Sequence, residues 1–209
     1  MKKVKYFFQY LIIKVLFFLF KILGYENSSN FGGLIGKIFG IFLKSKKIIK
    51  ENILKLNPNF SEDEIDNLTK LMFAEYMFIK DFRLNKLSKY IKINGESNLN
   101  EIKLNNKPVV FISAHFSNFE LMAMQIEKSG INLGAVYRPL NNIYLNKTME
   151  NLRKNYICRN QIKKGISGVR EILKLFQKNF SVAMMIDQRV TEGLKISFFK
   201  PFQNFDFHR

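Results

Sequence analysis

The stretch that decides the fold is PVVFISAHFSNFELM, residues 108–122, in which a short apolar run passes through a polar turn into a helical pattern. Two further apolar runs follow, INLGAVY at 131–137 and FSVAMMI at 180–186, and segments with helical patterning separate the runs. Short apolar runs that alternate with helices are typical of a parallel sheet. We therefore predict an α/β fold with a largely parallel sheet flanked by helices.

Polar residues follow each of the three apolar runs. His115 comes after the first, Arg138 and Pro139 after the second, and Asp187 and Gln188 after the third. In an open α/β sheet the carboxyl ends of the strands form the crevice that binds ligands. Parallel strands would therefore bring these three groups to one edge of the sheet.

His115 and Glu120 have a spacing that suits acyl transfer. A neutral imidazole can take the proton of an attacking hydroxyl, and a carboxylate on its other nitrogen fixes the tautomer. If the strand ends near Ala114 and a helix begins near Ser117 or Asn118, the two side chains are close enough to meet. A second interpretation stays open, because Ser117 and Glu120 also form a capping box.

Arg138 precedes a proline that stiffens the turn, which would direct its guanidinium toward a phosphate or a carboxylate, unless it only forms a surface salt bridge. Asp187 could orient Arg138 or the substrate across the crevice, or cap a turn. Lys164 and Arg170 belong to a basic loop that leads into a helix. Such a loop suits a phosphate or an acidic carrier protein, although a solvated run of charges is an equal alternative.

Length and composition indicate one domain, with 209 residues of which 47% are apolar. Lys and Arg number 34 against 17 Asp and Glu, and a net charge of +17 would attract anionic lipid, phosphorylated substrates, an acidic carrier protein or nucleic acid. Nucleic acid is disfavoured, because the aromatic residues lie in apolar runs and no binding motif is present. The single cysteine, Cys158, cannot form an internal disulfide, which indicates a reducing compartment or the cytoplasmic face of a membrane.

Residues 4–23, VKYFFQYLIIKVLFFLFKIL, are long enough to cross a bilayer as a helix. Lys14 and Lys21 nearly cancel the apolar gain and share one helix face, which suits a helix that lies in the interface or tilts. No cleavage site of small residues follows, so the segment should stay attached. We predict a membrane anchor or interfacial helix over residues 1–25 and one domain over 26–209, with a buried amphipathic helix as the alternative.

Two further helices are predicted between these regions. The basic stretch from Lys44 to Lys55 has a helical pattern that ends at Pro58. Ser61 and Glu64 form a capping box, from which a long amphipathic helix should continue toward Tyr90.

Four ordered motifs, HFSNFELM (115–122), VYRPLNN (136–142), KKGISGVREIL (163–173) and MMIDQR (184–189), resemble the bacterial lipid A biosynthesis acyltransferases. The resemblance implies that His115 is the general base, Glu120 its partner, and Arg138 a ligand of substrate phosphate. It places Asp187 in a further active-site block, and we also assign substrate binding to Asn118, Lys164 and Arg170.

The same resemblance implies an acyl thioester on acyl carrier protein as the donor and a hydroxyl of a phosphorylated glucosamine lipid as the acceptor. The reaction would take place at the cytoplasmic face of the bacterial inner membrane, without a cofactor or a metal ion. A lysophospholipid or another glycolipid is the alternative acceptor.

The end of the chain departs from the family pattern. Members of the family continue past the Asp-Gln block with further strands and helices, whereas here SFFK is followed by PFQNFDFHR. We therefore predict a truncation or frameshift near Lys200, which would leave the domain incomplete at its C-terminus. An inactive, membrane-associated remnant is thus the rival hypothesis from another functional class.

Overall fold

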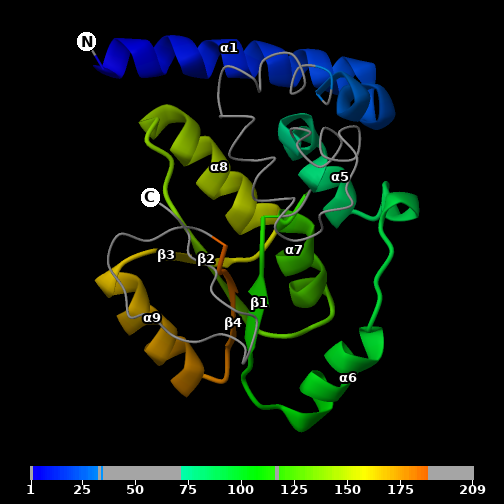
Figure 1. Ribbon diagram of the computed structural model, residues 1–209, viewed down its shortest axis with the longest axis vertical. Coiled ribbons are helices and arrows are strands. Elements are labelled where there is room, and N and C mark those ends of the chain that lie inside the picture. Colours follow the sequence, from blue (N-terminus) through cyan, green and yellow to red (C-terminus); the bar gives the residue numbers. More distant parts are fainter. Residues whose placement is uncertain (1, 33, 35–71, 116–117, 188–209) are drawn as a thin grey trace, which may run out of the picture.

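The computed structural model describes residues 2–32, 34, 72–115 and 118–187, and they form a sheet flanked by helices with a long N-terminal helix at one end (Figure 1). The helix predicted at 44–55 and the first part of the helix predicted from Ser61 lie outside the described residues. So does the departure expected near Lys200.

The sheet has four parallel strands in the order β1-β4-β2-β3, which are Val110–Ser113, Ser181–Met185, Leu133–Tyr137 and Asn160–Lys163. The predicted α/β fold with a parallel sheet is confirmed. Strand β3, with the sequence NQIK, had no apolar run to reveal it. It can be polar because, among the described strands, it lies at the edge of the sheet and pairs only with β2.

Helices cover the two faces of the sheet unequally. Helices α7 (Glu120–Lys128) and α8 (Ile143–Tyr156) share one hydrophobic core with the sheet residue Ala183. The next strand residue toward the N-terminus, Val182, is fully buried on the other face, since successive side chains of a strand point in opposite directions. That other face carries α9 (Ile166–Gln177), whose Gly168 lies so close to β3 that a Cβ atom would come 1.9 Å from the carbonyl oxygen of Lys163.

The long helix predicted to continue toward Tyr90 is wrong in the part that the structure describes. The chain forms a 3₁₀ helix, η1 (Met72–Phe78), then α5 (Ile79–Arg83), a turn, and η2 (Ser88–Tyr90). Helix α5 ends because Asn85 takes a left-handed backbone conformation, with φ of 62°. Helix α6 (Glu96–Asn105) follows and leads into β1.

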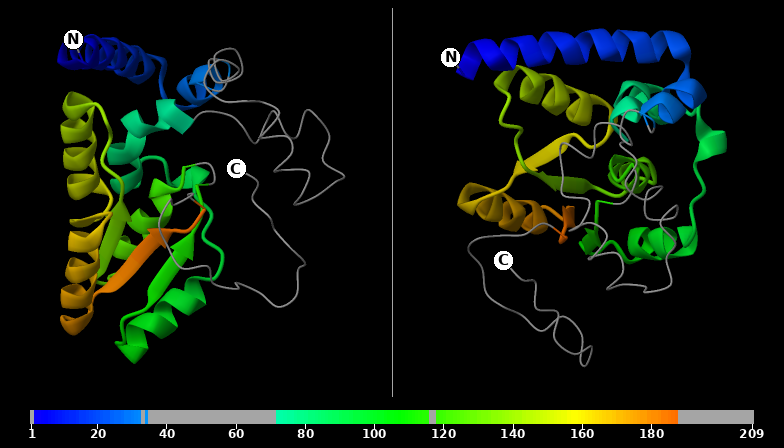
Figure 2. Two further views of the ribbon diagram at one scale, coloured as in Figure 1. Left: turned by 60° about the vertical axis from the view of Figure 1, so that its left-hand side comes forward. Right: turned by 45° about the horizontal axis from the view of Figure 1, so that its top comes forward.

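Helix α1 (Lys2–Leu23) lies along the outside of the domain beside α8, and the further views in Figure 2 agree on this arrangement. It ends at Gly24, whose φ of 76° suits glycine, and residues 25–32 continue as a second helical segment. Strands β1 and β4 run toward this end of the domain (Figure 1). The carboxyl edge of the sheet therefore faces the side that carries α1.

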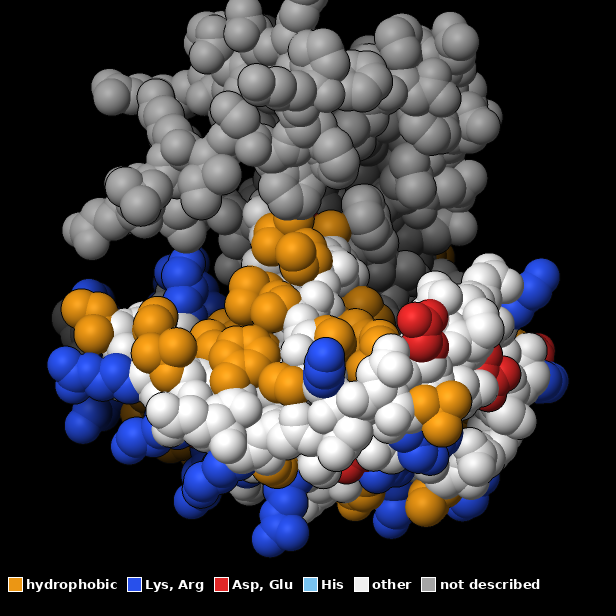
Figure 3. Space-filling model, turned by 90° about the horizontal axis from the view of Figure 1, so that it is seen from below, with side chains coloured by type: hydrophobic (Ala, Val, Ile, Leu, Met, Phe, Trp, Pro, Cys, Tyr) orange, Lys and Arg blue, Asp and Glu red, His pale blue; other side chains and the backbone are white. Residues whose placement is uncertain are grey.

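The opposite end of the molecule exposes hydrophobic side chains in its middle, with Lys and Arg around them (Figure 3). Among the exposed apolar residues, α9 contributes Ile166, Val169 and Leu173, and the edge strand β1 contributes Val110 and Ile112. Within the described residues no helix covers this part of the sheet beside α9.

Candidate active site

His115 and Asp187 meet at the carboxyl edge of the sheet. They follow the neighbouring strands β1 and β4, whose register pairs Ser113 with Met185, so the two residues stand level. The Nδ1 atom of His115 lies 2.7 Å from Oδ1 of Asp187, and the backbone N–H of His115 donates to Oδ2 at 2.8 Å. One carboxylate thus holds both the backbone and the ring of the histidine.

This contact sets the tautomer of the imidazole. An ionised carboxylate can only accept a hydrogen bond, so Nδ1 carries the hydrogen and Nε2 holds the lone pair of the neutral ring. Partial burial raises the pKa of Asp187, but the N–H and the ring of His115 outweigh it and hold that pKa below its usual value. The Phe119 ring packs edge-on against the imidazole, with the centroids 4.4 Å apart. The site therefore contains a histidine whose ring is held by an ionised carboxylate, an arrangement that suits a general base.

Glu120 occupies a different environment, although it is only five positions after His115. It is the first residue of α7, and its Oε1 accepts hydrogen bonds from the Tyr76 hydroxyl at 2.8 Å and from Nε of Arg153 at 2.7 Å. Nη2 of Arg153 lies 2.6 Å from the same oxygen, and the two charged side chains are only 8% and 10% exposed. Bonds between ionised partners are the stronger kind of hydrogen bond.

The pKa values of these groups follow from burial and from the pair. Burial, together with the charge of Glu120, raises the pKa of Tyr76 far above its usual value. Burial alone would lower the pKa of Arg153, but Glu120 and Tyr76 outweigh it and raise that pKa. The ion pair and the Tyr76 hydrogen bond tie α7 to α8 and η1.

The predicted partner of His115 is Glu120, but the carboxylate that contacts His115 in the structure is that of Asp187. The sequence predicts a substrate-binding role for Asp187. The structure shows Glu120 in contact with Tyr76 and Arg153. Its predicted role of orienting His115 stays a prediction. Helix α7 has Phe119 as its N-cap residue, without a capping side-chain bond, and the Ser117 of the suggested capping box lies outside the described residues.

Asn118 lies between the two carboxylates in the sequence and bonds to a third. Its Nδ2 donates to Oε2 of Glu75 at 2.9 Å, and the other oxygen of Glu75 accepts from Ser29 at 3.2 Å. The Oδ1 atom of Asn118, like Nη1 of Arg153, is buried with no hydrogen-bond partner among the described residues. Both atoms can therefore bond to water or to a substrate group.

The predicted basic residues follow the other strands of the same edge. Arg138 comes after β2 and Lys164 after β3, and both are exposed. With strands about 4.8 Å apart, these positions lie roughly 10 and 14 Å along the edge from His115. Arg170 is exposed on α9. The predicted convergence of His115, Arg138 and Asp187 on one edge is confirmed by the strand order.

The geometry of a histidine with a carboxylate at a sheet edge, beside cationic residues, occurs in several kinds of enzyme. The sequence matches the family model of the bacterial lipid A biosynthesis acyltransferases over residues 1–203, which includes every described helix and strand. The chain belongs to this family. It is therefore an O-acyltransferase, in lipid A biosynthesis. No curated protein matches the chain.

Sequence reasoning missed two residues of this lipid A acyltransferase, Tyr76 and Arg153, which surround Glu120. Arg153 had a detectable signal, because it lies four residues after the buried Met149 and so falls on the inward face of α8. A buried arginine needs a carboxylate, but the sequence did not indicate which one. Tyr76 had no signal of this kind.

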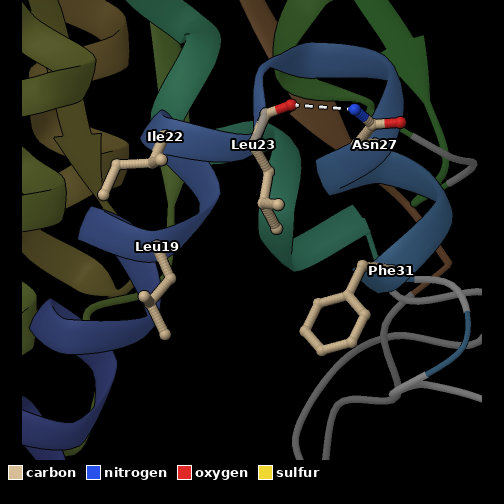
Figure 4. A pocket seen from close by; sticks show the side chains of 5 residues that line it. All are labelled: Leu19, Ile22, Leu23, Asn27 and Phe31. Atoms are coloured by element: carbon tan, nitrogen blue, oxygen red, sulfur yellow. Dashed lines mark hydrogen bonds between the residues drawn. The ribbon is translucent and has the colours of Figure 1, made fainter.

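The lipid A acyltransferase also has an apolar pocket that none of the predicted site residues lines. It has a volume of about 450 Å³ and lies between α1 and the helical segment that follows, lined by Leu19, Ile22, Leu23, Asn27 and Phe31 (Figure 4). Helix α1 is long and apolar enough to cross a membrane, and together with the family it suggests membrane association. Among the described residues no cluster of three His, Cys, Asp or Glu side chains could hold a metal ion.

Proposed function

We propose that this acyltransferase moves a fatty acyl group from the thioester of acyl carrier protein to a hydroxyl of a phosphorylated lipid A precursor, with His115 as the general base. The observation that supports this most directly is the 2.7 Å contact between Nδ1 of His115 and Asp187, which leaves the basic lone pair on Nε2. A positioned histidine at the ligand edge of the sheet is what deprotonation of a hydroxyl requires.

The reaction proceeds in two steps. Nε2 takes the proton of the acceptor hydroxyl while its oxygen bonds to the thioester carbonyl carbon, which gives a tetrahedral oxyanion. The C–S bond then breaks, the carbonyl forms again, and the imidazolium returns its proton to the leaving thiolate. The products are the acylated lipid and the free thiol of the carrier, and Asp187 stays ionised throughout to stabilise the imidazolium.

In this proposal the two carboxylates act differently. Asp187 orients His115, while Glu120 holds α7 against α8 and η1 through Arg153 and Tyr76 and so supports the turn that carries the histidine. The role predicted for Glu120 from its spacing, direct contact with His115, remains the alternative. The two carboxylates can be separated by mutation, because their partners differ.

The cationic residues along the edge are proposed to bind the anionic parts of the two substrates. Arg138 is the nearest to His115 along the sheet, and its guanidinium suits the phosphate of the lipid acceptor. Lys164 and Arg170 are exposed on the side of β3 and α9, where they suit a second phosphate or the acidic carrier protein. Asn118 would use its unpartnered Oδ1 to accept a hydrogen bond from the substrate.

The proposed location is the cytoplasmic face of the bacterial inner membrane. Cys158 is buried and reduced, with burial raising its pKa to about 11, and such a thiol fits a reducing compartment. The net charge of +17 suits both an anionic membrane surface and an acidic carrier protein.

The test is acyl transfer by a membrane preparation of the full chain, from acyl carrier protein to a lipid A precursor. His115→Ala should abolish the transfer. The chain has 2 histidines, so His208→Ala is a matched control that should keep full activity. Equal activity of the His115→Ala protein would reject the mechanism, and transfer to a lysophospholipid alone would favour the alternative acceptor. A folded protein without any transfer would support the inactive remnant.

A further inference from the structure

We infer that α1 lies flat along the surface of an anionic bilayer, with its outer face in the lipid and its inner face docked on the catalytic domain, so that it does not cross the membrane. This inference rests on the membrane association in the proposed function. It settles a choice that length and composition left open, because a 22-residue apolar helix can either span or lie in the interface.

The inner face of α1 is docked along most of its length. Near its start, Nδ2 of Asn142 donates to the carbonyl of Tyr6 at 2.8 Å, while the Asn142 side-chain oxygen caps α8. Near its end, the carbonyl of Phe20 accepts a 2.6 Å hydrogen bond from the buried Ser28 hydroxyl of the helical segment that follows α1. From Tyr6 to Phe20 the helix advances about 21 Å, most of the thickness of a hydrocarbon core.

Hydrophobic packing accompanies these two hydrogen bonds. Phe17 and Phe20 are the buried residues of α1, with exposures of 5% and 2%, and they pack with Tyr76 and Met77 of η1. The ring of Tyr144 on α8 packs against Phe7, with centroids 5.6 Å apart. Because both ends of α1 are attached to the same domain, the helix can cross a bilayer only if it leaves the domain and exposes these side chains.

The outer face of α1 is apolar and open. Six residues that share one side of the helix are between 42% and 67% exposed: Val4, Phe8, Leu11, Val15, Phe18 and Ile22. At about 100° per residue this side points away from Phe17 and Phe20. Side chains of this size, exposed in one continuous row, mark a surface that contacts another apolar phase.

Lysines separate the outer face from the docked face. Lys3, Lys14 and Lys21 are all exposed, and their spacings of 11 and 7 residues align them within about 20° on the helix. This line lies about a quarter turn from the middle of the apolar row. When the apolar row enters the acyl region, lysines on the side of the helix would lie at the level of the lipid phosphates and could contact them. In a spanning helix Lys14 would instead lie deep in hydrocarbon.

Charge favours lipid over a second copy of the chain as the occupant of this face. Two copies packed through their α1 helices would bring two lines of lysines together in a protein of net charge +17. An anionic lipid surface neutralises the same lysines. The pocket in Figure 4 continues the apolar face, because Leu19 and Ile22 of α1 line it, and it offers space for part of an acyl chain.

This placement brings the membrane close to the catalytic edge. Tyr76 packs against Phe17 and Phe20 of α1 and also donates to Glu120, so one residue separates the lipid-facing helix from the helix that follows His115. The strands run toward the same side (Figure 1). A lipid acceptor could therefore present its hydroxyl to His115 while its acyl chains stay in the bilayer.

The decisive measurement is the depth of three positions on the outer face. Val4→Cys, Val15→Cys and Ile22→Cys place a fluorescent label on one side of α1, at its start, middle and end, while native Cys158 is only 1% exposed and protected. The labelled full chain is bound to vesicles of phosphatidylglycerol and phosphatidylethanolamine, and quenching by lipids brominated at different depths is recorded.

We expect the three labels to lie at one shallow depth. A spanning helix would instead spread them, since positions 4 and 22 are about 27 Å apart along the axis. That spread, or quenching of all three labels by aqueous iodide alone, would overturn the inference. The same profile should be obtained with His115→Ala, because depth does not depend on turnover. Loss of activity and loss of the flat orientation are thereby distinguished.

The lysine line provides a second measurement. Replacing Lys3, Lys14 and Lys21 together by Gln should weaken binding to these vesicles roughly a hundredfold, since each lysine near an anionic surface gives roughly a fivefold gain in affinity. The control replaces three exposed lysines on other elements, Lys92, Lys174 and Lys178, with the same change in net charge. Equal weakening in both triple variants would mean that net charge alone drives binding, and would contradict the lysine line.

Discussion

The carboxylates of Asp187 and Glu120, the observed and the predicted partner of His115, have the same chemistry and opposite surroundings. Asp187 is 38% exposed at the end of a strand and holds His115, whereas Glu120 is 8% exposed and paired with Arg153. A buried ion pair is held by the need to keep both charges satisfied. A half-exposed carboxylate next to an imidazole can stay ionised and stabilise the positive charge of the ring when the ring gains a proton. Surroundings, more than distance along the chain, therefore separate the two roles.

The largest expected effect is the loss of turnover when the Asp187 carboxylate is removed. Asp187→Asn keeps the size of the side chain but removes the charge that stabilises the imidazolium and fixes its tautomer. The loss of such a carboxylate costs about 10⁴ in turnover, or about 5 kcal/mol of transition-state stabilisation. We expect kcat to fall by this order with little change in KM, and with unfolding by urea almost unchanged because an exposed pair adds about 0–1 kcal/mol.

Glu120→Gln is the matched control for that variant. Under our proposal it should lower the free energy of unfolding and reduce activity only as far as the folded fraction falls. A folded Glu120→Gln protein of normal stability with a 10⁴ loss of turnover would reverse the assignment, and would establish the partner predicted from spacing.

The next largest effect is a loss of stability when the buried Glu120 loses its partner Arg153. Arg153→Met leaves a carboxylate buried without its cation, which costs about 3–5 kcal/mol of unfolding free energy. Urea denaturation measures it, and Arg159→Met, an exposed arginine just beyond the same helix, should change stability by less than about 0.5 kcal/mol. In the double variant Glu120→Gln with Arg153→Met, much of the loss should be recovered, because both charges are gone. Additive losses in the double variant would contradict the pairing.

The sequence predicted, for a clear physical reason, that His115 and Asp187 lie at the same edge of the sheet. Apolar runs reveal buried strands, and parallel strands end at one edge, so His115 and Asp187 could be placed together. Their direct contact could not be foreseen, because β4 inserts between β1 and β2 and strand order is not written in sequence order. The sequence therefore predicts only that Asp187 orients Arg138 or the substrate, or caps a turn.

The partner of Glu120 was harder to predict. The spacing of His115 and Glu120 is local information, but the partner of Glu120 is Arg153, 33 residues away on another helix. That contact depends on how α7 and α8 pack on the sheet, which the helical pattern of either segment does not determine. The polar strand β3 escaped detection for a related reason, since an edge strand can do without an apolar run.

A smaller effect is expected at Tyr76, whose hydroxyl donates to the buried Glu120. Tyr76→Phe removes only that hydroxyl and should lower the unfolding free energy by about 1.5–3 kcal/mol, the usual range for a hydrogen bond to a charged group. Tyr137→Phe is the comparison, because its hydroxyl donates to Glu150, which lies nearer the surface. The Tyr137 variant should lose less stability than the Tyr76 variant, and the reverse order would argue against a specially stabilised Glu120.

The smallest effect is the pH dependence of the Asp187 contact. His115 lowers the pKa of Asp187 below its ordinary value of 3.8, so the folded chain binds this proton less readily than the unfolded chain. The contact therefore contributes its full stability above pH 3.8 and loses it as the pH falls through the lower value of the folded protein. The unfolding free energies of the wild type and of Asp187→Asn should accordingly differ by a constant amount near pH 6 and converge toward pH 2. A difference that stays constant down to pH 2 would mean that Asp187 titrates alike in the folded and unfolded chains, and its hold on His115 would then be too weak to orient the base.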